Sequence, residues 1–122
     1  MTGRRPLPTV IAAALALTAL WAPGAEPQQS LRFMTGPQGG SWIPLGGAIA
    51  EVAQKEIPGL TITVMPGAGI ANVKAIEAGK AELGFGNANS TADAIAGRKP
   101  FDAEAKNVRH VATLYNQYFQ MV

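Results

Sequence analysis

Three short apolar segments, each followed by a polar corner and then by a helix-like segment, constrain the fold of this chain more than any other feature. The apolar segments are residues 31–35, 60–65 and 82–86, and the corners, rich in glycine or asparagine, are residues 36–41, 67–72 and 87–90. Strands that alternate with helices in this way predict a parallel sheet joined by right-handed crossovers. The sequence therefore predicts an α/β fold.

The first expected helix starts at about Ser41 and stops before Pro58. Pro44 falls in its first turn, where a missing N–H has no intrahelical partner. Apolar residues recur at close to the helical period and predict one buried face, made of Leu45, Ile49, Val52, Ala53 and Ile57. Polar residues, Gln54 among them, are expected on the opposite face.

Two further helices are expected after the second and third strands. One spans residues 70–78, and Gly79 is predicted to end it as a left-handed cap. The other has Ser90 and Asp93 as a capping box and ends at Gly97.

The last part of the chain is predicted to be a polar connection followed by two more strands. Phe101 lies in the connection and is expected in the core. Residues 108–115 and 118–122 are predicted to be strands of the same sheet.

Uncharged polar side chains gather at the corners, namely Thr35, Ser41, Asn72, Asn87, Asn89 and Ser90. Ligands of open parallel sheets bind outside the carboxyl ends of the strands, where all three corners are expected to lie. In the first corner, glycines and a helix start suit a carboxylate or a phosphate. A glycine-rich turn without any ligand is the alternative for that corner alone. The set as a whole predicts recognition of a polar small molecule without turnover.

The sequence contains no combination of residues that is typical of a catalytic site. His110 is the only histidine, and we expect it to be structural or at the surface. There is no cysteine, no Gly-x-Ser-x-Gly motif and no P-loop lysine. Acidic residues are scattered over the predicted helix exteriors. We therefore expect a protein that is not an enzyme and that holds no metal or cofactor.

Charge is balanced once the first residues are set aside. Arg4 and Arg5 account for the excess among ten Lys and Arg, and the remaining eight match the eight Asp and Glu. This balance gives no support to nucleic-acid binding. The two arginines, an apolar run over residues 10–22 and the small residues 23–25 are typical of a secretory signal peptide. Residues 1–25 are thus predicted to be a signal peptide that directs residues 26–122 to the periplasm, and a membrane anchor is the alternative.

A resemblance to a known family rests on several segments taken together. These are residues 36–50 (GPQGGSWIPLGGAIA), 66–73 (PGAGIANV), 76–83 (IEAGKAEL), 87–97, 100–101 and 111–115. The sequence resembles the TAXI-type solute receptors, which are the periplasmic binding subunits of tripartite ATP-independent (TRAP) transporters. The resemblance implies a type II periplasmic-binding-protein fold with two lobes. It also implies capture of a small carboxylate-bearing solute, such as glutamate or a related organic acid, and delivery to an ion-gradient-driven membrane permease.

The resemblance also implies which residues contact the solute: Gly39, Gly40, Ser41, Trp42, Gly69, Asn72, Asn87, Ser90 and Tyr115. Capping the first helix is the alternative role of Ser41. Two positions differ from the family pattern, since Trp42 stands where tyrosine is frequent and Gly69 where serine is usual. Trp42 brings a donor but no acceptor.

Only the start of a two-lobed receptor is covered by the resemblance. We therefore expect residues 26–122 to be an incomplete amino-terminal lobe that lacks the second lobe. Other readings of the same residues are a binding lobe that serves a sensor or signalling system, a remnant of an α/β enzyme or transferase, and a truncated chain that no longer binds.

Overall fold

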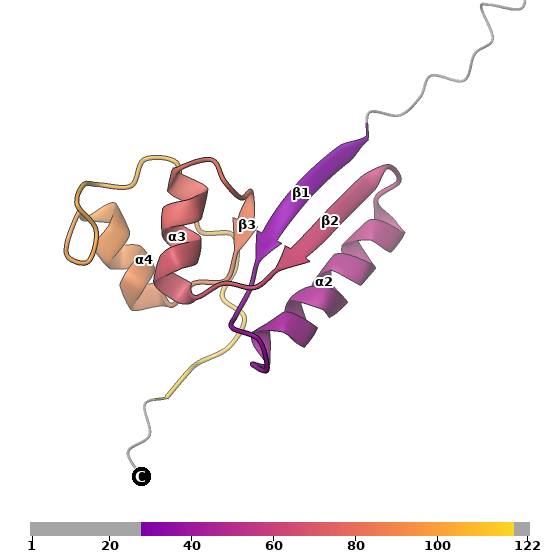
Figure 1. Ribbon diagram of the computed structural model, residues 1–122, viewed down its shortest axis with the longest axis horizontal. Helices are drawn as coiled ribbons and strands as arrows, with labels where there is room; N and C mark the ends of the chain where they lie inside the picture. The colour runs from indigo at the N-terminus through magenta and orange to yellow at the C-terminus, as the bar shows by residue number, and fades with distance from the viewer. Residues whose placement is uncertain (1–27, 119–122) are drawn as a thin grey trace, which may run out of the picture.

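The computed structural model describes residues 28–118, which form a three-stranded parallel sheet with three helices (Figure 1). The strands β1 (Gln29–Met34), β2 (Leu60–Met65) and β3 (Leu83–Gly84) lie in the order β2-β1-β3. The helices α2 (Trp42–Glu56), α3 (Gly69–Glu77) and α4 (Ala88–Ile95) follow β1, β2 and β3 in turn. The predicted α/β fold with a parallel sheet is confirmed, and it agrees with part of a periplasmic-binding-protein-like lobe. The predicted signal peptide lies outside the described residues.

β1 is the central strand of the sheet. It pairs with β2 along its whole length, from Gln29 opposite Leu60 to Met34 opposite Met65. It pairs with β3 only at its carboxyl end, where Phe33 lies opposite Leu83. All pairs are parallel, so the chain leaves the three strands at one edge of the sheet, as predicted.

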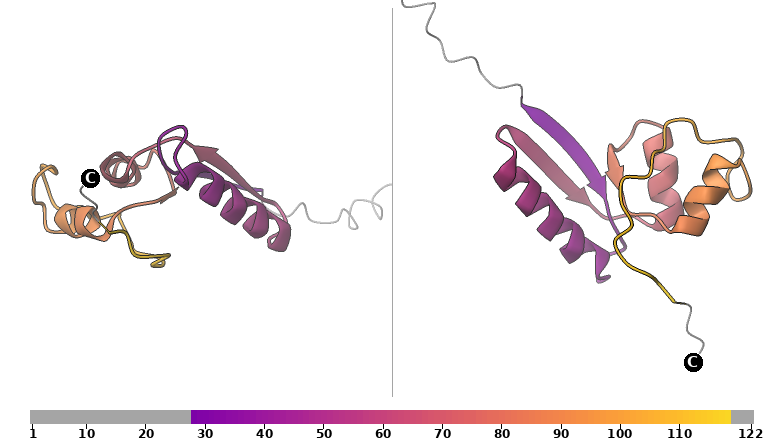
Figure 2. Two further views of the ribbon diagram at one scale, coloured as in Figure 1. Left: turned by 90° about the horizontal axis from the view of Figure 1, so that it is seen from below. Right: turned by 180° about the vertical axis from the view of Figure 1, so that it is seen from behind.

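Two apolar clusters hold the layers together. One lies between the sheet and α2 and is centred on Phe33, Ala50 and Ile62. The other joins α3, α4 and the segment after α4, through Val73, Ala94, Phe101 and Val108. Figure 2 shows α2 alongside β2, and α3 and α4 packed together beyond β3. The prediction that Phe101 belongs to the core is confirmed.

The buried face of α2 is narrower than predicted. Val52 is 62% exposed and Ile57 is 50% exposed, so their assignment to the core was wrong. Ile49, Ala50 and Ala53 make the contact with the sheet instead. The predicted polar Gln54 turns toward β2, and its Oε1 accepts the backbone N–H of Ile62 at 2.7 Å.

The helix ends agree with the predictions at two glycines and differ at one cap. Gly79 has a φ angle of 67°, which confirms the predicted left-handed cap, and Gly97, which was predicted to end the next helix, has a similar φ angle of 62°. The predicted capping box of Ser90 is wrong, because α4 starts earlier, with Asn87 at its N-cap. Ser90 lies inside the helix, and its N–H donates to Oδ1 of Asn89 at 2.9 Å.

The segment after residue 107 contains no strand within the described residues, so the predicted strand over residues 108–115 is wrong. Val108 is buried, but residues 109–118 are all exposed. A strand needs a neighbour that takes up its N–H and C=O groups, and the nearest edge strand, β3, has two residues. Nη1 of Arg109 also donates a hydrogen bond to the carbonyl oxygen of Val108 at 2.8 Å, so this carbonyl already has a partner. Most of the other predicted strand, residues 118–122, lies outside the described residues.

Candidate functional site

The first two corners are hydrogen-bonded to each other at the carboxyl edge of the sheet. The backbone N–H and the hydroxyl of Thr35 both donate to the carbonyl of Met65, each at 2.9 Å. The N–H of Gly67 donates to the carbonyl of Gly36 at 3.0 Å. Thr35 is fully buried, so water does not compete for its bonds. The loops after β1 and β2 are therefore held as one unit.

The side chain of Asn72 lies beneath the corners and is fully buried. Its Nδ2 lies 2.7 Å from the carbonyl of Thr35, 2.8 Å from that of Phe85 and 3.3 Å from that of Met34. Its Oδ1 accepts the N–H of Ala68 at 3.0 Å. The amide therefore ties the ends of β1 and β3 to the start of α3. Asn72 was predicted to contact the solute, but its amide is engaged inside the protein and does not line the pocket described below.

Glycines at the corner leave room for this amide. A Cβ atom at Gly67 would overlap Oδ1 of Asn72, and a Cβ atom at Gly84 would lie 3.1 Å from Cβ of Asn72. The second corner therefore needs glycine for close packing around Asn72, whatever the ligand.

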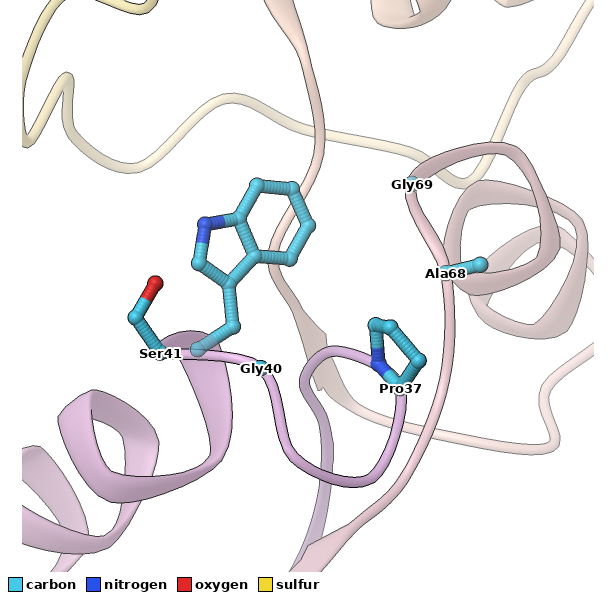
Figure 3. A pocket seen from close by; sticks show the side chains of 6 residues that line it. Pro37, Gly40, Ser41, Ala68 and Gly69 are labelled. Atoms are coloured by element: carbon cyan, nitrogen blue, oxygen red, sulfur yellow. The ribbon is translucent and has the colours of Figure 1, made fainter.

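An open pocket of about 300 Å³ lies where the first two corners meet (Figure 3). Its lining residues are Pro37, Gly40, Ser41, Trp42, Ala68 and Gly69. Figure 3 shows Gly40 and Ser41 on one side and Ala68 and Gly69 on the other. The volume is at the lower end of the range for small-molecule sites. The lining has no charged side chain.

The pocket is bordered by the starts of α2 and α3. Neither helix has an acidic residue in its first turn, so the positive end of each helix dipole is not neutralised there. The side chain of Ser41 makes no capping hydrogen bond. The alternative prediction that the Ser41 hydroxyl caps the helix is therefore wrong, and Ser41 instead lines the pocket.

Two predicted site residues that are 73 positions apart in sequence contact each other. Nε1 of Trp42 donates to the hydroxyl oxygen of Tyr115 at 2.6 Å. The ring of Trp42 packs edge-on against Phe85, with 5.5 Å between centroids. Tyr115 itself is absent from the pocket lining.

None of the residues that line the pocket belongs to the third corner. The Asn87 amide lies close to the lining residue Gly69, since a Cβ atom at Gly69 would lie 3.2 Å from Nδ2 of Asn87. Ser90 lies on α4, and Gly39 is exposed in the turn before Gly40. Neither belongs to the lining.

The structure brings Gly40, Ser41, Trp42 and Gly69 together in one pocket. Sequence reasoning missed two apolar lining residues, Pro37 and Ala68. Both stand within the predicted corners, but the search there favoured glycines and hydrogen-bonding side chains. Position in the corner was the signal that could have found them.

Ion pairs lie away from the pocket. Glu82 precedes β3, and its carboxylate accepts the side chain of Arg32 and the backbone N–H of the same residue at 2.7 Å. The hydrogen bond from the Arg32 side chain is the main cause that lowers the pKa of Glu82 to about 2. Backbone N–H groups of Lys106 and then Asn107 lower the pKa of Glu77, which holds the segment after α4.

Residues 28–118 contain no cluster of three or more acidic or histidine side chains that could hold a metal ion. In the same part of the chain no helix combines the length and the hydropathy needed to cross a membrane. His110 is exposed and lies outside any strand, and its Nε2 is 3.2 Å from Oγ1 of Thr113.

Comparison with known families places the described corners inside one match. The model of the NMT1-like family matches residues 33–122. The match starts within β1 and therefore includes all three corners and Tyr115. No solved structure matches the chain.

Proposed function

Because the chain belongs to the NMT1-like family, a family of periplasmic-binding type, we propose that it is an extracytoplasmic receptor for a small carboxylate-bearing solute. The family supports a solute-binding domain. The solute class, a glutamate-like compound or a related organic acid, is our proposal and follows the resemblance to TAXI-type receptors. So do the TRAP permease as partner and binding without chemical turnover.

One observation carries this proposal, namely the pocket between the first two corners. Backbone N–H groups in the first turn of a helix have no intrahelical partner, and they suit an anionic oxygen. Two helix starts border this pocket, and the Ser41 hydroxyl adds a donor. A carboxylate placed there would be stabilised by helix dipoles and hydrogen-bond donors, without a positively charged side chain in the lining. Such a site suits a solute that must be released again.

The proposed location is the periplasm. The order of charged, apolar and small residues over positions 1–25 supports it, because that order is typical of a cleaved signal peptide. Sequencing the mature amino terminus of periplasmic material is the corresponding test. Recovery of intact Met1 in a membrane fraction would contradict it.

Substitution of Ser41 tests the binding role directly. The probes are L-glutamate, 2-oxoglutarate and the monocarboxylate pentanoate, titrated by calorimetry into the full chain. Ser41→Ala should weaken the affinity for the acid that binds by roughly 10-fold, because a hydrogen bond to a charged group contributes about 1.5–3 kcal/mol. The melting temperature should not change, since Ser41 makes no cap.

Ser30→Ala is the matched control, because Ser30 is exposed near the amino end of β1, far along the strand from the pocket. It should leave both affinity and melting temperature unchanged. If none of the three acids binds the unaltered chain, the proposed solute class is wrong. Equal affinity of Ser41→Ala and the unaltered chain would remove the pocket from the proposal.

A further inference from the structure

Trp42 has the largest side chain in the pocket lining, and the fold fixes its ring from within. A Cβ atom at Gly36 would lie 2.8 Å from Cβ of Trp42 and 3.4 Å from Cγ of Trp42. The Trp42 side chain therefore packs directly against the backbone of Gly36. Phe85 packs edge-on against the indole, and Phe33 packs edge-on against Phe85 with 4.8 Å between centroids. This aromatic row connects the pocket wall to the core between the sheet and α2.

The polar atom of the indole is occupied by Tyr115. An indole has one donor and no acceptor, and this donor lies 2.6 Å from the Tyr115 hydroxyl oxygen. The same oxygen accepts Nε2 of Gln117 at 3.3 Å. Trp42 therefore offers only apolar carbon to the pocket. Tyr115 affects the pocket through Trp42, since it is not part of the lining itself.

The remaining lining makes the pocket strongly apolar. Pro37, Trp42 and Ala68 contribute carbon, two glycines contribute backbone, and Ser41 has the only polar side chain besides the indole N–H. A second carboxylate or an ammonium group would find no charged side chain in this lining. An acid that extends into this lobe with a hydrocarbon chain would bury that chain against Pro37 and Trp42.

We propose that Tyr115 is a positioning residue that holds the indole of Trp42 as an apolar wall, and that the solute presents an apolar body to this wall beside its acid group. The inference rests on the proposed function, because it specifies which carboxylate-bearing solute the same pocket takes. Within the proposed class, the inference favours a related organic acid with an apolar body, for which pentanoate is the probe, over a glutamate-like diacid, for which pentanedioate of equal chain length is the probe.

The hydrogen bond is tested without any solute. The reference is the full chain with Trp21→Phe, because Trp21 and Trp42 are the two tryptophans. Tyr115→Phe removes the acceptor and keeps the ring. Tyr118→Phe is the matched control, since Tyr118 is also exposed and is not among the residues that line the pocket. Loss of one net hydrogen bond of about 1 kcal/mol corresponds to roughly fivefold faster hydrogen exchange at the indole N–H.

NMR of the isotope-labelled chain should show this acceleration in Tyr115→Phe and not in Tyr118→Phe. Both variants should keep the melting temperature of the reference, because both tyrosines are exposed and outside helices and strands. Equal exchange rates in the two variants would overturn the proposal.

Calorimetry with pentanoate and pentanedioate tests the consequence for the solute. Pentanoate should bind more tightly than pentanedioate to the reference chain. Tyr115→Phe should weaken pentanoate binding by roughly fivefold, and Tyr118→Phe should not. Tighter binding of pentanedioate, or unchanged pentanoate affinity in Tyr115→Phe, would overturn this inference and leave the proposed receptor function standing. If neither pentanoate nor pentanedioate binds, and L-glutamate and 2-oxoglutarate do not bind either, both the inference and the proposed function are overturned.

Discussion

Replacing Asn72 by alanine should destabilise the fold, because its buried amide connects three segments of the chain. The substitution removes two short bonds from Nδ2, to the carbonyls of Thr35 and Phe85, and one to Oδ1 from the N–H of Ala68. All three backbone groups lose their side-chain partner, and the carbonyl of Thr35 loses it in a buried position. At about 0.5–1.5 kcal/mol net for each bond, the expected loss in free energy of unfolding is about 2–4 kcal/mol.

The loss is large against the roughly 5–15 kcal/mol that stabilises an ordinary domain. In a chain of this size it corresponds to a melting temperature lower by roughly 10–30 °C. Urea unfolding of the full chain measures it, and the midpoint should fall while the slope stays the same.

Asn87→Ala is the matched control for Asn72→Ala. It removes the same amide from a half-buried corner residue whose side chain makes no capping bond. Its unfolding midpoint should stay close to that of the unaltered chain. The reasoning is refuted if Asn72→Ala unfolds at the unaltered midpoint and loses solute binding. That result would restore the role that the sequence predicts for Asn72, a contact with the solute.

Two further predictions follow from the packing and from the charges. Gly67→Ala should lower the free energy of unfolding by about 1–3 kcal/mol, because its Cβ would overlap Asn72. Gly47→Ala on α2 should raise the free energy of unfolding by about 0.5–1 kcal/mol, because its Cβ would meet nothing within 4 Å. Urea unfolding measures both changes. The pKa of Glu82 is about 2 in the fold against an ordinary 4.5, so the ion pair with Arg32 stabilises above pH 4.5, and its contribution is lost as the pH falls from 4.5 toward 2. Glu82→Gln should lower the melting temperature at pH 7 and leave it unchanged near pH 2; an equal difference at both values would contradict the assignment.

The regular part of the fold could be predicted because local sequence and packing agree there. β2 occupies residues 60–65 as predicted, since alternating β-branched residues suit a strand with one buried face. Gly79 and Gly97 end their helices because only glycine adopts a left-handed angle at little cost. Residues 108–115 contain apolar and β-branched residues, as β2 does, but this composition does not provide a neighbouring strand. Whether a strand forms there is decided by pairing, which no local pattern contains.

The candidate site was predictable in place but not in detail. Topology alone puts the three corners at one edge, and the structure brings Gly40, Ser41, Trp42 and Gly69 to one pocket. The sequence does not distinguish a polar side chain that faces the solvent from one that faces inward. Asn72 follows a strand and stands in a glycine-rich corner, as a ligand contact would, yet its amide satisfies backbone groups.

Polar residues at strand ends thus serve two purposes in this chain, and burial separates them. A corner that binds a solute through backbone N–H groups must keep that backbone rigid, because a flexible loop would have to be ordered when the solute binds. Thr35 and Asn72 provide the rigidity from below through bonds to carbonyls, and glycine lets them approach closely. The side chains that line the pocket on the outer side of this support, Pro37, Ser41 and Trp42 among them, remain to select the solute. Substitution of Thr35 or Asn72 should therefore change stability first, whereas substitution of Ser41 should change affinity alone.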